Sequence, residues 1–514
     1  MVSRAVFAAD FYSLFRTFGE ESKKEESFLI LSNVLSMDKL SRMRASQSTA
    51  PFFEEIRRYA GEPLVAFHTP GHKAGLNWEQ DWLSSKELAR LDLTEITSLD
   101  WQVSLSRAEA LAAEFYEADQ SFFLVQGASQ GILALMMGAF HPGDQVLVAR
   151  NCHISVIHAM ILADLVPVYL KTPFLEEWGI PGSVQELALS QSLSLYPDCK
   201  GVILTNPTYQ GVLGPLSGLR GIIGERLLII DEAHGGYFGW SGLKNFDAYP
   251  FADAWVQGTH KILGSMTQTG MLHLRNLRID GERIRRSLEL ITTTSPSYIL
   301  LASLDCNRKF LATTGKAMFE AKTPAMLEYK KEIAGVGDLE VLDEDRLPDS
   351  AEKVDPWKLC LSFKKLGFSG YQVERILRTE FKIQVEYADY NQVTLFMAPW
   401  QGPNVLQELQ KALEEICRRF GNEQVRTILP GGIPPLKMHP REAALGAGSF
   451  IDLSEAAGRV SADLIAPYPP GIPLIAPGEL IRDEEIVLID RVINHGGMVR
   501  GVSPKGKIRV ANCG

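Results

Sequence analysis

The sequence predicts an α/β protein with a mostly parallel β-sheet, followed by a small α+β domain and a C-terminal α+β domain. Between about residues 64 and 290, short strand-like runs alternate with stretches whose apolar residues recur at helical spacing. Such alternation is typical of a parallel sheet with helices on both faces. The length of 514 residues exceeds what one ordinary core accommodates, which favours two or three domains.

The expected elements of the large domain follow one another in a regular order. The strand-like runs are SFFLV (121–125), QVLVA (145–149), VPVYL (166–170), GVILTN (201–206), RLLIID (226–231) and DAWVQ (253–257), with helices expected over 129–140 and 155–165. A long helical stretch then covers 297–333. Segments between 356 and 419 have the pattern strand, helix, strand, strand, helix, which predicts a small α+β domain.

These patterns divide the chain into four parts. Residues 1–50 are an extension of doubtful order, 51–296 form the large, major domain, 297–427 the small domain and 428–514 the C-terminal domain. The Pro- and Gly-rich segment 427–442 marks the last boundary, because these residues interrupt helices and strands.

Composition excludes several functional classes. A net charge of −10 with no basic stripe argues against nucleic acid as a partner. No apolar run reaches the roughly 18 residues that span a bilayer, so a membrane is not expected either. The six cysteines form no C-x-x-C pair, which predicts no metal site and a reducing compartment, the cytoplasm.

Polar or small residues follow several of the predicted strands, where ligands of open parallel sheets bind. The run GASQG (127–131) opens a helix, so its N–H groups and the Ser129 hydroxyl could hold an anion. The alternative is an ordinary turn with Ser129 as the helix N-cap. His153 begins the next helix, where an imidazole could stack on a flat ring, transfer a proton or serve the fold alone.

Asp231 ends the apolar run RLLIID. A buried carboxylate needs a partner, and a cationic ring nitrogen is one candidate. Ala233 lies on the same side of an extended chain and is small enough to sit under a ring. The alternative role for Asp231 is a helix N-cap.

Lys261 follows His260 in VQGTHKILGSMTQTG (256–270), a segment with few other charges. A lysine that forms a Schiff base must be partly deprotonated, which a low-dielectric setting favours. Thr259, Thr267 and Thr269 offer neutral hydrogen bonds nearby. An anion cradle, a stacking imidazole, a buried aspartate and a lysine amine in this order are what pyridoxal 5′-phosphate (PLP) requires.

At this point the chain resembles the fold-type-I, PLP-dependent Orn/Lys/Arg decarboxylases, in their shorter bacterial arginine/lysine branch. The resemblance covers about residues 51–510. The motifs that carry it are FHTPGHKAG (67–75), DLTEI (92–96), FFLVQGASQG (122–131), RNCHISV (150–156), TNPTYQG (205–211), DEAHGGYF (231–238), GTHKILGSMTQTGMLH (258–273), TTTSPSY (292–298) and PYPPGIPLIAPGE (467–479).

The resemblance implies a role for each matching residue. Lys261 binds PLP covalently, Asp231 pairs with its ring nitrogen, and His153 and Ala233 cover the two ring faces. The phosphate is held by four further residues: Ala128, Ser129, Gln130 and His260. Thr294 or Ser295 reaches the phosphate of a neighbouring subunit, so a homodimer with shared active sites is implied. His72 and Lys73 lie near the site.

Some positions depart from the family's pattern. Ile154 stands where a lysine is usual, Gly258 where a serine often donates to the phosphate, and Ala128 where a hydroxyl residue is common. A restored hydroxyl at residue 258 is expected to tighten cofactor binding. Between Asp100 and the helical run RAEALAAEF, an entrance loop of the family is reduced to WQVSLS (101–106).

The resemblance implies decarboxylation of a basic amino acid, arginine before lysine or ornithine, to the amine and CO2, in polyamine metabolism. A substrate cation needs a carboxylate, and Glu95, Asp100 and Glu479 are the candidates. Two alternatives stay open: another fold-type-I enzyme, such as an aminotransferase, or a catalytically silent regulatory relative. Lys261 and Asp231 argue against the silent relative, which has no chemical need of either.

Overall fold

The structure is a computed structural model that describes residues 58, 61–77, 89–93, 101–275, 278–349, 351–421, 425, 427, 432–468 and 471–512. The chain separates into two units, Met1–Pro63 and Leu64–Gly514, and the account below concerns the second unit. The predicted extension over 1–50 and the candidate carboxylates Glu95 and Asp100 lie outside the described residues.

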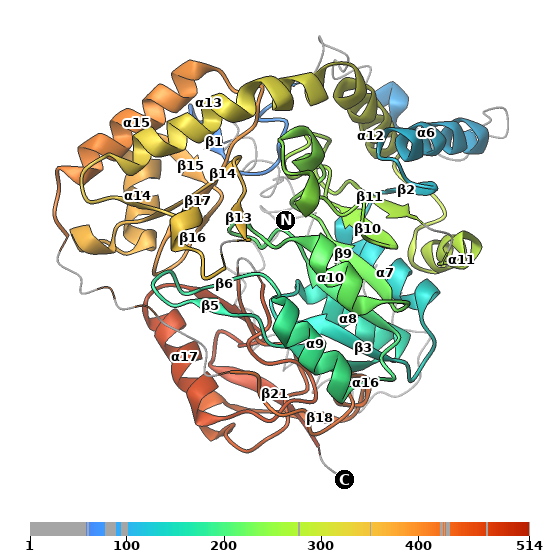
Figure 1. The fold of residues 1–514 in the computed structure, drawn as a ribbon. Coiled ribbons are helices and arrows are strands. Elements are labelled where there is room, and N and C mark those ends of the chain that lie inside the picture. Colours follow the sequence, from blue (N-terminus) through green and yellow to red (C-terminus); the bar gives the residue numbers. More distant parts are fainter. Residues whose placement is uncertain are drawn as a thin grey trace, which may run out of the picture. The chain divides into compact units, whose positions relative to one another are not determined.

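A seven-stranded sheet forms the centre of the large domain (Figure 1). Its order is β2 (Gln120–Leu124), β11 (Gly270–Leu274), β10 (Ala254–Gln257), β9 (Leu227–Asp231), β7 (Gly201–Thr205), β3 (Gln145–Ala149) and β4 (Val166–Leu170). Strand β11 runs antiparallel to both of its neighbours, and the other described pairs are parallel. The predicted fold class, α/β with a mostly parallel sheet, is therefore confirmed.

Both faces of this sheet are buried, because successive side chains of a strand point to opposite faces. In β9, Ile229 packs into one core, and Leu228 and Ile230 pack into the other. The first core is closed by α7 (Gly127–Ala139), α8 (Ile154–Ala163) and α11 (Gly281–Ile291), and the second by α6 (Trp101–Phe115), α9 (Glu186–Leu195), α10 (Leu216–Ile223) and α12 (Tyr298–Phe310). The two apolar cores hold the strands of the sheet in place, and with them the strand ends at which the candidate site lies.

Helix α6 begins at Trp101, whereas the sequence predicted a short loop over 101–106 before the helix. The prediction was wrong at this point, since WQVSLS forms the first turns of the helix. None of its residues is Gly or Pro, so nothing in it opposes helical backbone.

The predicted small α+β domain has a second sheet, in the order β12 (Glu340–Val341), β14 (Lys358–Ser362), β17 (Val393–Phe396) and β16 (Tyr387–Ala388). Three helices pack on it: α13 (Lys316–Ala334), α14 (Gly370–Glu380) and α15 (Pro403–Cys417). A π-helical turn, Leu311–Gly315, joins α12 to α13. Strand β1 (Val65–Phe67) pairs with β15 (Ile383–Val385), so the N-terminal edge of this unit joins the small domain.

The C-terminal part consists of short pieces around a core of its own. Strand β18 (Gly448–Asp452) pairs with β21 (Lys507–Ala511), and β19 (Ala466–Tyr468) with β20 (Met498–Arg500). The remaining elements here are α16 (Pro440–Leu445), α17 (Asp483–Asn494) and a 3₁₀ turn at Leu453–Glu455.

Shorter elements connect these parts. Strand β8 (Val212–Leu213) pairs with β13 (Lys353–Val354), and β5 (Phe174–Leu175) with β6 (Ile180–Pro181). Further 3₁₀ turns lie at Phe238–Trp240, Lys244–Phe246, Glu344–Arg346 and Lys364–Leu366. Within the described ranges, no helix has both the length and the apolar character needed to cross a bilayer.

Candidate active site

The register of the central sheet brings Asp231 and Lys261 into one site. Asp231 is the last residue of β9 and lies beside Val256 of the parallel strand β10. Beyond β10 the chain turns at Gly258, whose carbonyl accepts a hydrogen bond from the Lys261 N–H at 2.8 Å. Two adjacent strands thus end in a carboxylate and an amine.

Asp231 is 4% exposed, and its Oδ1 accepts a hydrogen bond from the Ala233 N–H at 3.1 Å. The chain then turns back rather than starting an α-helix, so the helix N-cap alternative is wrong. Burial raises the pKa of Asp231, while the nearby Lys261 and the Ala233 N–H oppose that rise. The carboxylate is therefore held in an environment that favours a cationic partner.

The Lys261 ε-amine lies 2.7 Å from Nε2 of His234. His234 is buried, and its ring contacts the rings of Tyr209 and Phe396 at centroid distances of 4.9 and 5.3 Å. Burial and then the Lys261 charge lower the pKa of His234 well below its usual value. A neutral His234 can accept a hydrogen bond from the lysine amine.

The pKa of Lys261 is lowered by burial, and the carboxylates of Asp231 and Glu386 act against this change. A lowered pKa increases the fraction of neutral amine, which is the nucleophilic form. This direction agrees with the expectation from sequence. The neighbouring hydroxyls, which were expected to offer hydrogen bonds near the lysine, bind one another instead. The Ser265 hydroxyl is hydrogen-bonded to the hydroxyls of Thr259 and Thr269 at 2.8 and 2.6 Å, which holds the loop together.

The expected anion cradle corresponds to the start of α7. Its N-cap is Gln126, and the side chain of Gln126 makes no capping bond. Ser129 lies inside the first turn, so the Ser129 N-cap alternative is wrong. The N-terminus of a helix with uncapped N–H groups attracts an anion. A cavity of about 360 Å³ at this point is lined by Ser129, His153 and Arg500, among others.

The side chain of Gln130 is engaged within this turn. Its Oε1 accepts the N–H groups of Val125 and Gln126 at 3.2 and 3.1 Å, and its Nε2 donates to Thr292 Oγ1 at 2.5 Å. Gln130 therefore shapes the cradle and ties it to the segment after α11. Thr294 and Ser295, further along that segment, are exposed.

His153 is the N-cap of α8, where its Nδ1 accepts the Ser155 N–H at 3.2 Å and lies 2.8 Å from Ser155 Oγ. Burial, followed by the charge of Lys261, lowers the pKa of His153 to about 3. The structural role of His153, which the sequence left open, is therefore confirmed: it caps α8. The same hydrogen bonds fix the orientation of a neutral ring, as a stacking role requires.

His260 lies next to the cradle. Its Nδ1 is 2.7 Å from the Thr269 carbonyl, and burial lowers its pKa to about 4. A Cβ placed on Gly127 would lie 4.0 Å from the His260 ring, and one on Gly270 would lie 3.0 Å from the Ala128 nitrogen. The segment that carries Lys261 (256–270) and the start of α7 are therefore in contact.

The predicted benefit of a serine at residue 258 conflicts with the local packing. A Cβ at Gly258 would lie 2.9 Å from the Ala233 carbonyl oxygen and 3.2 Å from Cδ of Lys261. The first distance is shorter than real Cβ contacts allow. A side chain here therefore displaces the turn that carries Lys261.

The PGHK loop (70–73) packs beneath the lysine segment. The Gly71 N–H donates to the His260 carbonyl at 2.8 Å, and Trp400 Nε1 donates to the Gly71 carbonyl at the same distance. Lys73 is buried and donates to the carbonyls of His68 and Phe396 at 2.6 and 2.9 Å. The amine of Lys73 therefore ties this loop to the small domain.

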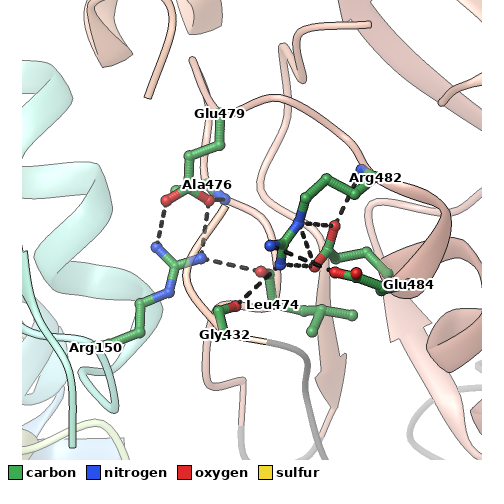
Figure 2. Close-up of polar contacts among 8 residues, drawn as sticks. Arg150, Gly432, Leu474, Ala476, Glu479, Arg482 and Glu484 are labelled. Carbon is green, nitrogen blue, oxygen red and sulfur yellow. Dashed lines mark hydrogen bonds and ion pairs between the residues drawn. The ribbon is translucent and has the colours of Figure 1, made fainter. Parts of the chain in front are cut away.

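Glu479 does not provide the free carboxylate expected for a substrate cation. Arg150 binds both of its oxygens, at 2.7 and 2.8 Å, and the Ala476 N–H donates to it at 2.7 Å (Figure 2). Glu479 is fully buried, and its charge is already matched. The expectation for this residue was wrong, because the sequence does not show that the end of β3 and the C-terminal part meet.

Glu386 is the carboxylate that sequence reasoning missed. It lies between β15 and β16 and is partly exposed. Its oxygens accept hydrogen bonds from the Tyr209 hydroxyl at 2.9 Å and the Thr69 N–H at 2.6 Å. Its charge raises the pKa of Lys261. Strand pairing of β1 with β15, which no short-range pattern reveals, brings it to the site.

Comparisons with known proteins show which family the chain is similar to. The Orn/Lys/Arg decarboxylase major domain matches residues 50–344, and the Orn/Lys/Arg decarboxylase C-terminal domain matches residues 430–492. The chain belongs to the Orn/Lys/Arg decarboxylase family. An arginine decarboxylase of Bacillus subtilis is 33% identical over 471 residues, which are 89% of this chain and 96% of that protein.

More distant members of the Orn/Lys/Arg decarboxylase family share the fold. The constitutive lysine decarboxylase of Escherichia coli is 24% identical over 554 residues, covering 86% of this chain and 77% of that one. A solved structure of an E. coli constitutive lysine decarboxylase superposes with a TM-score of 0.71 at 20% identity, covering 92% of this chain and 84% of that one. An alanine–glyoxylate aminotransferase from Nostoc superposes at a TM-score of 0.51 with 16% identity, over 65% and 92% of the two chains.

Proposed function

We propose that this protein decarboxylates a basic amino acid, arginine before lysine or ornithine, to the corresponding amine and CO2 with PLP as cofactor. The observation that carries the proposal is that the Lys261 amine and the buried Asp231 carboxylate follow adjacent strands, and that His260, next to Lys261, lies beside the start of α7. Arginine is placed first because relatives above 30% identity are named arginine decarboxylases.

The residues at the site fit PLP. The cofactor has a carbonyl carbon, a basic ring nitrogen and a dianionic phosphate. Lys261 offers an amine with a lowered pKa, Asp231 a buried carboxylate, and Ser129 a hydroxyl at a helix N-terminus. The amine is thus suited to the carbonyl carbon, the carboxylate to a protonated ring nitrogen, and the helix N-terminus to the phosphate. Ala233, 9% exposed, and His153 are proposed for the two ring faces, and Ala128, Gln130 and His260 for the edge of the cradle.

When bound, PLP supplies a conjugated ring that accepts the electron pair released at the substrate's Cα. Asp231 would hold a proton at the ring nitrogen, which a neutral side chain in its place could not do. Lys261 would provide the covalent anchor and could return a proton at Cα after CO2 leaves. His234, held neutral, can accept a hydrogen bond from the Lys261 amine and so orient it.

Glu386 is proposed to bind the distal cation of the substrate. A guanidinium or ammonium group that leaves water needs a carboxylate close by. Glu386 is partly exposed, and its charge reaches Lys261. The Tyr209 and Thr69 hydrogen bonds hold it in place and leave capacity for further donors, because a carboxylate has about four lone-pair sites.

Four further statements belong to this proposal. A homodimer would place the exposed Thr294 and Ser295 of one chain at the phosphate of the other. The product amine suits a role in polyamine metabolism, and a location in the cytoplasm agrees with the cysteine pattern. The predicted domain boundaries at residues 296 and 427 also stay predictions.

Reduction with borohydride tests the cofactor chemistry. We expect the purified protein to absorb visible light, the absorption to disappear on reduction, and mass spectrometry to place the reduced cofactor on Lys261. Lys261→Ala should lose both the covalent adduct and turnover while keeping its circular dichroism spectrum. Near-normal turnover by Lys261→Ala, or an adduct on another lysine, would show that Lys261 is not the residue that binds the cofactor.

A further inference from the structure

Lys358 is a fully buried lysine close to the candidate active site. It is the first residue of β14, in the four-stranded sheet of the small domain (Figure 1), and it is 0% exposed. A lysine rarely leaves water completely unless its ammonium group finds partners that compensate for the lost hydration. The partners of Lys358 therefore indicate what its amine does in the protein.

The amine of Lys358 binds the backbone of the loop that follows β7. Its Nζ donates to the carbonyls of Thr208 and Tyr209 at 3.2 and 3.1 Å. The Asp355 carboxylate lies 4.0 Å from the same nitrogen, beyond hydrogen-bond distance, and accepts the Tyr237 hydroxyl at 2.6 Å. The hydrogen bonds of Lys358 are therefore directed at the loop rather than at a carboxylate.

The loop after β7 is a closed turn that lies against Lys358. The Thr208 N–H donates to the Val212 carbonyl at 2.9 Å, which closes the turn. Gly211 has a φ of +102°, which favours glycine, and a Cβ placed on it would lie 3.1 Å from Cδ of Lys358. Lys358 thus fixes the position of this turn relative to the four-stranded sheet.

Tyr209 links the turn to two residues of the candidate site. Its hydroxyl donates to Glu386 Oε1 at 2.9 Å, and its ring meets the His234 ring edge-on at a centroid distance of 4.9 Å. The charge of Lys358 also reaches the site, because after burial and the charge of Lys261 it further lowers the pKa of His234. Lys358 therefore supports, through Tyr209, the carboxylate proposed for the substrate cation.

We infer that Lys358 is a positioning residue for substrate binding, which holds the backbone at Thr208 and Tyr209 so that the Tyr209 hydroxyl keeps Glu386 in place. The inference rests on the proposed function, and in particular on the role of Glu386. Without the Lys358 amine, the Tyr209 hydroxyl is still present but less well placed. Binding of the distal cation should therefore suffer more than the chemical step.

Lys330 is a matched control, because it makes the same kind of contacts at a different place. It is 7% exposed, and its Nζ donates to the carbonyls of Asp355 and Lys358, both at 3.0 Å. These carbonyls lie at and just before the start of β14, not in the turn after β7. Lys330→Met therefore removes a buried amine and two hydrogen bonds to backbone, as Lys358→Met does, but leaves the donors to the turn.

A double-mutant cycle, measured by steady-state kinetics with arginine on the PLP-loaded full-length protein, tests the inference. Lys358→Met should raise KM about fivefold and lower kcat less than about twofold, with an unchanged fraction of borohydride adduct. Adding Lys358→Met to Glu386→Gln should raise KM no further, because the placement of residue 386 matters little once its charge is gone. Lys330→Met should leave KM unchanged.

Several results would overturn the inference alone: turnover with an unchanged KM in Lys358→Met, a double variant whose KM is the product of the two single effects, or an equal rise in KM in Lys330→Met. If Lys358→Met does not fold, Lys358→Gln takes its place in the cycle, with a rise in KM of about threefold expected and an unchanged KM contradicting the inference. By contrast, no amine product from arginine, or no effect of Glu386→Gln on KM, would overturn the proposed function on which the inference rests.

Discussion

Nε2 of His234 lies 2.7 Å from the ε-amine of Lys261, in a site where burial lowers the pKa of both residues. Because burial lowers the pKa of both bases, and they lie at hydrogen-bond distance, the pair is suited to holding the Lys261 amine in one orientation. Tyr209 and Phe396 fix the imidazole by ring contacts. The amine is thus positioned by a residue on the turn after β9 and carried by the turn after β10.

His234→Phe should lower kcat by about 10²-fold, because the ring shape stays while the acceptor for the lysine amine is lost. His234→Gln, which keeps a polar atom near the same place, should retain more activity. Cofactor content and circular dichroism serve as controls. Equal loss in Gln and Phe variants, together with reduced cofactor content, would indicate that His234 acts through packing alone.

Asp231→Asn should retain bound cofactor and lose several orders of magnitude in rate. A neutral amide cannot hold a proton on a ring nitrogen, so the electron-accepting capacity of the ring falls. Single-turnover rates and the cofactor's absorption spectrum measure the two effects separately. A rate within about tenfold of the parent, a barrier change of only ~1.4 kcal/mol, would place Asp231 away from the ring nitrogen.

Gly258→Ser should weaken cofactor binding, because its Cβ would lie 2.9 Å from the Ala233 carbonyl oxygen and close to the Lys261 side chain. Gly258→Ala is the matched control, with the same Cβ and no hydroxyl. Both variants should show a smaller fraction of protein modified by borohydride at equal cofactor concentration. Tighter binding by the serine variant alone would mean that a hydroxyl–phosphate bond outweighs the steric cost.

Glu386→Gln should raise KM for a basic amino acid about tenfold, or ~1.4 kcal/mol, with a smaller change in kcat. Loss of binding common to the ground and transition states appears in KM. Glu320→Gln removes a charge from an exposed position of α13 and should leave both constants unchanged. An unchanged KM for Glu386→Gln would show that the substrate cation binds elsewhere.

Much of the large domain could be predicted from the sequence, because its strands are buried on both faces and appear as continuous apolar runs. Strand β3 (Gln145–Ala149) has the predicted bounds, and β9 (Leu227–Asp231) differs by one residue. Strand β11 was missed: GMLHL includes a histidine and has no helix before it in the strand–helix alternation. Its His273 is buried and contacts Ser121 Oγ at 2.7 Å, a pairing that only the folded sheet reveals.

The parts of the candidate site that follow directly from local sequence patterns were predicted, and the parts that depend on distant contacts were not. Lys261, Asp231 and the α7 cradle stand at strand ends, where position alone suggests chemistry. His234 lies within the quoted DEAHGG motif and could have been considered there. Glu386 and the pairing of Arg150 with Glu479 depend on contacts between residues far apart in sequence. No spacing rule identifies such contacts, so the sequence did not show that the Glu479 carboxylate is already paired with Arg150.

The central claim, decarboxylation of a basic amino acid, is tested most directly by one competitive assay. Arginine, lysine, ornithine and leucine are offered at equal concentration to the PLP-loaded protein, and CO2 and the organic products are identified. The account predicts CO2 with an amine product from the basic amino acids, arginine fastest, and none from leucine. Leucine decarboxylated as fast as arginine, or a keto acid accumulating without any amine, would contradict it and favour an aminotransferase.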